Sequence, residues 1–191
     1  MKKLFLLACF SFTFGLGAIF AGANSWQVDA EHSDAHFTVR HLGIATVQGD
    51  FTKMTGTVDI DDQDISKSTV TATIDVASVD TRVEARDKSI RGPEYFDVEK
   101  YPTMTFQSTK IWKAGDIAKM AGNLTIHGVT KEVTFDVIGP TPPIKVNGVN
   151  RRGATATTKV NRKDFGVSGG APGVVGDDIN IELDLELVGP K

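Results

Sequence analysis

The sequence predicts an all-β protein whose antiparallel strands, about eight in number, form a barrel or a sandwich. Apolar and polar residues alternate with a period of two in segments spread along the chain, and short polar turns separate these segments. A strand that is apolar on one face only fits an antiparallel sheet with a dry interior and a solvated exterior. Closing such a sheet removes its exposed edges, which favours the barrel.

The predicted strands recur from Trp26 to the C-terminal region. In the first of them, Ala35, Phe37, Val39 and His41 share one face and alternate with polar residues. The same alternation covers residues 54–60, 69–76 and 124–137, the last with a turn at residues 127–130 that indicates a hairpin. Residues 179–187 form the clearest strand, because every second residue is Ile or Leu.

One short helix is expected to interrupt the strands. Residues 81–91 are good helix formers, and Gly92-Pro93 ends the pattern. A further turn at residues 93–97 carries Tyr95 and Phe96, which need an apolar environment. In a barrel such an insertion can cap one mouth, and the alternative is a surface connection.

Three histidines near the N-terminus resemble a metal site, but strand geometry separates them. His32 and His36 would lie about 13 Å apart in an extended chain, and His36 and His41 point to opposite faces. We therefore expect no shared metal ion. His41 faces inward, where it either contacts the polar end of a ligand or is a core histidine bonded to a backbone carbonyl.

The N-terminus predicts a secretory signal over residues 1–23. Lys2 and Lys3 precede an apolar run that ends in an A-x-A cleavage site at Ala21–Ala23, and the alternative is an uncleaved anchor. Removing Lys2 and Lys3 from the 21 basic residues leaves 19 against 24 acidic ones, a net charge of −5. This balance excludes the basic surface of a nucleic-acid-binding protein. Residues 24–191 lack cysteine and are long enough for one domain.

Two loops resemble ligand-binding motifs but are not predicted to be binding sites. The glycine-rich segment 166–178 lacks Gly-Lys-Ser/Thr and precedes a strand, so it predicts a mobile rim loop and not a nucleotide site. The acidic segment 59–64 lacks the central glycine and terminal glutamate of a calcium loop, which indicates a solvated turn.

Ordered motifs cover nearly all of the chain after residue 25. They are Trp26, Val28, Asp29, His32, Ser33, Phe37, His41, Leu42, Gly49 and Phe51, then RDKSIRGPEYFDVEKYPTMTF at 86–106, GNLTIHGVTKEVTF at 122–135 and KDFGV at 163–167. With these motifs the chain resembles the YceI-like family, periplasmic proteins of lipocalin-like fold that bind polyisoprenoids and similar long-chain lipids. Ser89-Ile90 departs from the His-Leu that relatives often carry, so no polar role is assigned there.

The resemblance implies an eight-stranded lipocalin-like barrel over residues 24–191, with a helical insertion near residues 81–97. About eight strands enclose room for one small ligand. The expected cavity lining is inward-facing and largely apolar, and each member could instead belong to a filled core. It comprises Phe37, Val39, His41, Phe51, Val58, Ile74, Val76, Phe96, Met104, Phe106, Leu124, Ile126, Phe135 and Phe165.

The expected function is therefore a periplasmic binding or carrier protein for a polyisoprenoid, an isoprenoid quinone or a fatty acyl derivative. No cofactor other than this lipid is expected, and the expected partners are the lipid, transiently a membrane, and a second copy in a homodimer. One alternative is a hydrolase with His41 as general base and Ser33 or Ser168 as nucleophile, although no nucleophile elbow or metal-ligand spacing supports it. Another is an interaction module with a filled barrel.

Overall fold

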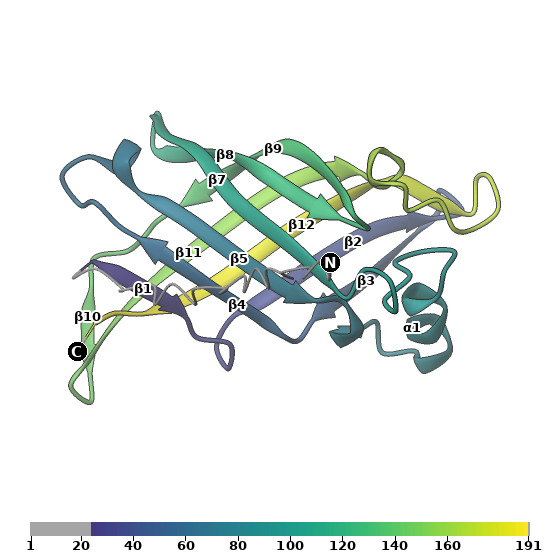
Figure 1. The fold of residues 1–191 in the computed structure, drawn as a ribbon, viewed down its shortest axis with the longest axis horizontal. Coiled ribbons are helices and arrows are strands. Elements are labelled where there is room, and N and C mark those ends of the chain that lie inside the picture. The colour runs from purple at the N-terminus through teal and green to yellow at the C-terminus, as the bar shows by residue number, and fades with distance from the viewer. Residues whose placement is uncertain (1–23, 191) are drawn as a thin grey trace, which may run out of the picture.

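In the computed structural model, which describes residues 24–190, the chain forms twelve strands, one α-helix and three 3-10 helices (Figure 1). The strands are β1 (Ser25–Val28), β2 (Asp34–His41), β3 (Ala45–Phe51), β4 (Met54–Asp59), β5 (Thr69–Asp75), β6 (Val79–Asp80), β7 (Thr103–Ala114), β8 (Ile117–Ile126), β9 (Val129–Ile138), β10 (Ile144–Val146), β11 (Val149–Asn161) and β12 (Val175–Val188). The helices are η1 (Ile65–Lys67), η2 (Val76–Ser78), α1 (Glu84–Arg91) and η3 (Arg162–Phe165). The predicted signal segment, residues 1–23, lies outside the described residues.

Eight of the strands form a closed antiparallel ring. Their order is β1, β4, β5, β7, β8, β9, β11 and β12, and β12 pairs back with β1. The longest pairing of the ring joins β11 to β12, residues 151–161 against residues 178–188. The predicted eight-stranded antiparallel barrel is confirmed.

Three of the four remaining strands, β2, β3 and β6, extend the wall at one end, and the fourth, β10, pairs with β11. β2 pairs with β12 and with β3, and β3 pairs with β6. None of the pairings in residues 24–190 joins β6 to β7. Helix α1 lies at this edge instead (Figure 1), where the Arg91 guanidinium donates to the carbonyls of Ala77 (2.8 Å) and Val79 (2.7 Å). The predicted helical insertion is therefore present, at one end of the barrel.

Helix α1 begins three residues later than the sequence pattern predicts. Arg82 has a left-handed backbone conformation with φ 64°, which cannot start a right-handed helix. The backbone N–H of Thr81 donates to the Asp87 carboxylate (2.9 Å), and the Thr81 hydroxyl bonds to the same oxygen. Residues 81–83 thus form a turn that is tied back to the helix through a buried side chain.

Local turn chemistry explains where two of the predicted strands begin and end. β8 and β9 are joined by His127 and Gly128, which both have positive φ, the conformation of tight hairpin turns. β12 begins at Val175, four residues before the predicted Ile179, because its pairing with β2 shifts register between these two residues. Such a bulge interrupts the period-2 pattern and hides the start of the strand from sequence analysis.

A small apolar cluster of Trp26, Ile60 and Leu187 lies beside β1, which is at the barrel end opposite α1 (Figure 1). The Arg152 guanidinium lies over the Trp26 ring, 4.8 Å from its centroid, and donates two hydrogen bonds to Asp62 (2.8 and 2.7 Å). The predicted turn at residues 59–64 therefore also carries an ion pair at this end of the barrel.

Candidate functional site

An internal cavity with a volume of about 200 Å³ lies among the inward-facing side chains of the barrel. Its lining is almost wholly apolar and comes from strands around the ring as well as from β2, β3 and the segment after α1. The volume is below the ~300–1,000 Å³ of typical small-molecule sites. A long-chain ligand must therefore displace side chains, and the flexible Met54, Met104 and Met120 are in the lining.

The structure brings most of the predicted lining residues together around this cavity. They are Phe37, Val39, Phe51, Val58, Ile74, Phe96, Met104, Phe106, Leu124, Ile126, Phe135 and Phe165. Their contact with a bound lipid stays a prediction.

His41 does not belong to the cavity lining, and its assignment is corrected. It is the last residue of β2, opposite Val175 on β12 and Ala45 on β3. The chain turns immediately afterwards, at Leu42 and Gly43. Residue parity places His41 on the side of Val39, but His41 is not among the residues that line the cavity.

The assignment of Val76 to the cavity lining is also corrected. The alternation of residues 70–76 places it beside Ile74, yet β5 ends at Asp75. The Asp75 carboxylate accepts a hydrogen bond from the Ala77 N–H (3.0 Å) and starts a 3-10 turn. Val76 is consequently buried in the core, at 1% exposure, outside the cavity lining.

Aromatic residues from three segments meet near the end of the cavity that α1 covers. The Phe51 ring lies 5.7 Å from that of Phe37 and 5.8 Å from that of Phe96, centroid to centroid. Ile90 of α1 and Tyr95 of the following turn complete this part of the lining. The turn at residues 93–97 thus places its two aromatic residues against the cavity.

Arg162 holds the glycine-rich loop that borders the same end of the barrel. Its Nε donates to the carbonyl of Gly176 (2.9 Å), and Nη1 donates to those of Val167 (2.8 Å) and Gly169 (2.9 Å). Nη2 donates to the Val175 carbonyl (3.2 Å) and to the Asp177 carboxylate (3.3 Å).

All five N–H donors of this buried guanidinium are therefore used by the loop. Arg162 has none left to bind the head of a ligand, although it borders the cavity. The loop, which the sequence predicts to be mobile, is tied to this one side chain.

Several lining residues were not predicted from the sequence, among them residues of β11 and β12. Ala156, Val160, Leu183 and Leu185 line the cavity. β11 is rich in Thr and Ala and has a weak apolar signal, but the spacing of Ala154, Ala156 and Val160 is that of one strand face and could have revealed it.

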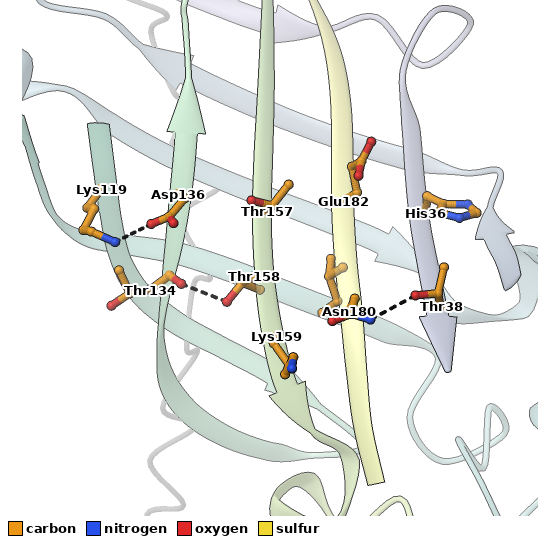
Figure 2. A pocket seen from close by; sticks show the side chains of 11 residues that line it. His36, Thr38, Lys119, Thr134, Asp136, Thr157, Thr158, Lys159, Asn180 and Glu182 are labelled. Atoms are coloured by element: carbon orange, nitrogen blue, oxygen red, sulfur yellow. Dashed lines mark hydrogen bonds and ion pairs between the residues drawn. The ribbon is translucent and has the colours of Figure 1, made fainter. Parts of the chain in front are cut away.

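A second hollow, of about 500 Å³, lies on the outer surface across β8, β9, β11, β12 and β2 (Figure 2). Two pairs of its side chains contact each other. Lys119 contacts Asp136 (2.5 Å), and the Asn180 amide donates to the Thr38 hydroxyl (3.1 Å). Because these groups are polar and face solvent, this hollow gives an apolar ligand no enclosure.

Among residues 24–190, one group of side chains has the spacing of a metal site: Asp29, His32 and Glu186. The Arg151 guanidinium occupies it, bonding to Asp29 (2.8 Å) and to Glu186. Hydrogen bonds from Arg151 and His32 hold the pKa of Asp29 below its usual value. His36 lies apart and contacts Asp50 (2.6 Å), as strand geometry predicts.

A family model for the YceI-like domain matches residues 26–187. The chain belongs to the YceI-like family. The YceI proteins of Salmonella agona and Salmonella arizonae are 36% and 37% identical to it, over 88% and 86% of this chain and 88% and 85% of theirs.

Solved structures agree with this YceI-like assignment. BcnA of Burkholderia cenocepacia has a TM-score of 0.74 at 26% identity, over 83% of this chain and 98% of that one. The Campylobacter jejuni YCEI protein has a TM-score of 0.70 at 30% identity, over 80% and 90%. A polyisoprenoid binding domain from Saccharophagus degradans has a TM-score of 0.64 over 86% and 98% of the chains, and at 15% identity it shows the fold alone.

Proposed function

We propose that this protein encloses the apolar chain of a long amphiphilic lipid inside its barrel and carries the lipid through the periplasm. The observation that carries the proposal is the apolar cavity, which is bordered at one end by α1 and the Arg162 loop. Membership of the YceI-like family supports a binding role, as does the fold shared with a polyisoprenoid binding domain. Polyisoprenoids, isoprenoid quinones and fatty acyl derivatives are the ligand classes that fit.

Recognition in this proposal rests on the tail of the lipid. Among the described residues, Arg162 is the only Lys, Arg, Asp or Glu that lines the cavity. Its N–H donors already bind the glycine-rich loop. The polar head is accordingly placed at the α1 end, outside the cavity. This arrangement selects for chain length and shape and tolerates different heads.

The energetics suit a carrier. Sixteen methylenes moved from water into the barrel gain roughly 13 kcal/mol at ~0.8 kcal/mol each. A lipid that leaves a bilayer already sits in hydrocarbon, so transfer between bilayer and barrel is close to neutral. Exchange in both directions is then possible, which a shuttle needs.

Native mass spectrometry of the purified protein, followed by solvent extraction, tests the proposal. A one-to-one adduct whose extract contains a prenyl, quinone or acyl lipid is expected. Protein that carries no lipid and takes up neither a fluorescent prenyl nor a fluorescent acyl analogue would contradict it and favour a filled-barrel interaction module. Hydrolysis products in the extract would favour the hydrolase.

The periplasmic location is part of the same proposal. No helix within residues 24–190 is long and apolar enough to span a bilayer. The A-x-A sequence at Ala21–Ala23 leads us to expect that the intact mass of protein from the periplasmic fraction corresponds to a chain beginning near Asn24. Full-length protein in the membrane fraction would contradict this.

A further inference from the structure

The barrel end that carries α1 also has an uncharged apolar rim. Two segments form it, and together they are called the rim patch. One is residues 42–48, the β2–β3 turn and the start of β3, and the other is residues 166–176, before and at the start of β12. Neither contains Asp, Glu, Lys or Arg, although 24% of the chain is charged. The segments are adjacent, because the Leu42 N–H donates to the Val174 carbonyl (2.8 Å).

The most exposed part of the rim patch is the tip of the β2–β3 hairpin. Leu42 is 52% exposed and Ile44 is 80% exposed, the highest value among the large apolar residues described. These two side chains are not part of the hydrophobic core, and only Gly43 separates them in the chain.

Leu42 also has a backbone conformation that leucine disfavours. The turn is closed by a hydrogen bond from the Ile44 N–H to the His41 carbonyl, and its central residues Leu42 and Gly43 have φ of 53° and 69°. Two positive φ angles favour Asn-Gly at these positions, and a bulky residue there is strained. Folding alone would therefore select asparagine and not leucine at position 42, which points to a function for the exposed leucine.

The rim patch is continuous with the lipid cavity. Val175 of the patch itself lines the cavity, and so does Val39, whose strand β2 ends directly before Leu42. Arg40 lies at the base of the hairpin, where its guanidinium donates to the Gly43 carbonyl (2.8 Å) and the Thr46 hydroxyl (2.9 Å). The nearest charge in the hairpin is thus basic and lies behind the apolar tip.

We propose that the rim patch docks on the surface of a phospholipid bilayer, with Leu42 and Ile44 among the acyl chains and Arg40 at the level of the phosphates. This inference rests on the proposed function. Uncharged segments avoid the desolvation cost that a charge would meet in hydrocarbon, and an arginine behind them can extend to the head groups. Docking at this end lets a lipid pass between bilayer and cavity without crossing water.

The test is the double variant Leu42→Asn, Ile44→Thr, matched by Ile138→Thr, Ile144→Thr. The control residues are 65% and 61% exposed; Ile138 ends β9 and Ile144 begins β10, which lies at the barrel end opposite α1 (Figure 1). Vesicles of phosphatidylethanolamine and phosphatidylglycerol carry a fluorescent prenyl analogue, and both transfer to the protein and co-sedimentation with the vesicles are measured. The rim variant should transfer about ten-fold more slowly or worse, since burial of one large aliphatic side chain alone exceeds a ten-fold effect. The control should match wild type.

The rim variant should be at least as stable as wild type, because asparagine suits the turn. A slow transfer therefore cannot be attributed to unfolding. Transfer as fast as wild type from vesicles would overturn the docking proposal. A loss of self-association in sedimentation velocity with unchanged vesicle binding would also overturn it and assign the patch to contact between copies.

A different result would contradict the proposed function without testing the rim patch. If wild type does not bind the analogue when it is dispersed in buffer without vesicles, the barrel does not hold this lipid class. Vesicle co-sedimentation of the lipid-free protein still reports on the rim patch in that case.

Discussion

Filling the cavity from its wall should separate ligand binding from folding. Ala156 lies in the middle of β11, is 2% exposed and lines the cavity. The next residue, Thr157, is exposed on the outer surface. A phenyl ring introduced by Ala156→Phe therefore projects into the cavity, whereas Thr157→Phe places the same ring outside the barrel and serves as the matched control.

Opposite effects on stability and affinity are expected. An empty apolar cavity costs about 24 cal/mol per Å³, so a volume of about 200 Å³ corresponds to a cost on the order of 5 kcal/mol. Filling part of it should raise the free energy of unfolding by about 1–2 kcal/mol. Each methylene of the lipid that the ring excludes costs ~0.8 kcal/mol, so exclusion of three weakens binding by about 2.4 kcal/mol, roughly fifty-fold in Kd.

Urea denaturation gives the stability, and titration with a fluorescent prenyl analogue gives the affinity. Ala156→Leu adds less volume and should give intermediate values if the phenyl ring overpacks the barrel. If Ala156→Phe is folded and binds the analogue as tightly as wild type, the ligand does not occupy this cavity and the reasoning is refuted.

Three further predictions follow from side chains outside the cavity. His41→Phe should leave the affinity for the analogue unchanged, because His41 lies outside the lining; a loss of about 0.5–1.5 kcal/mol, the usual net value of one hydrogen bond, would return it to the site. Asp62→Asn should lower the free energy of unfolding at neutral pH by about 1–3 kcal/mol, less any screening of this exposed carboxylate, by removing the charged partner of Arg152. The Arg152 hydrogen bonds hold the pKa of Asp62 below its ordinary 3.8, so in wild type this stabilisation is present above pH 3.8 and is lost as the pH falls further. Urea titrations across this pH range should show that the stability of Asp62→Asn depends less on acid than the stability of wild type does. An equal dependence would contradict the assignment. Chelation should not change the melting temperature, since Arg151 occupies the Asp29, His32 and Glu186 group; a fall would reveal a bound metal.

Period-2 alternation was enough to predict the barrel, because one face of nearly every strand is dry. β4, β5 and the β8–β9 hairpin lie where the alternation placed them. β11 was missed since Thr and Ala give little contrast between its faces, even though it forms the longest pairing of the ring. The local sequence shows which residues share a strand face, but the difference in hydrophobicity between the two faces is clear only when the inward residues are large.

The errors at the candidate site have a different cause, because parity does not say where a strand ends. His41 and Val76 both have the parity of the lining and both stand at a strand terminus, one at the end of β2 and the other just after β5. Arg162 was not singled out in the sequence, and it is buried because loop carbonyls accept its hydrogen bonds. Those contacts are local in the chain, but they depend on a loop path that the glycine-rich sequence does not specify.

The unpaired edge between β6 and β7 affects the motions available to the barrel. Where strands pair, widening the wall breaks a ladder of backbone hydrogen bonds, and the global stability resists it. At this edge α1 is held through side chains, among them the Arg91 contacts with Ala77 and Val79. Segments held in this way open with a fraction of the global unfolding free energy. Helix α1 is therefore expected to open at a lower free energy than the paired strands of the ring, which stay folded when it does.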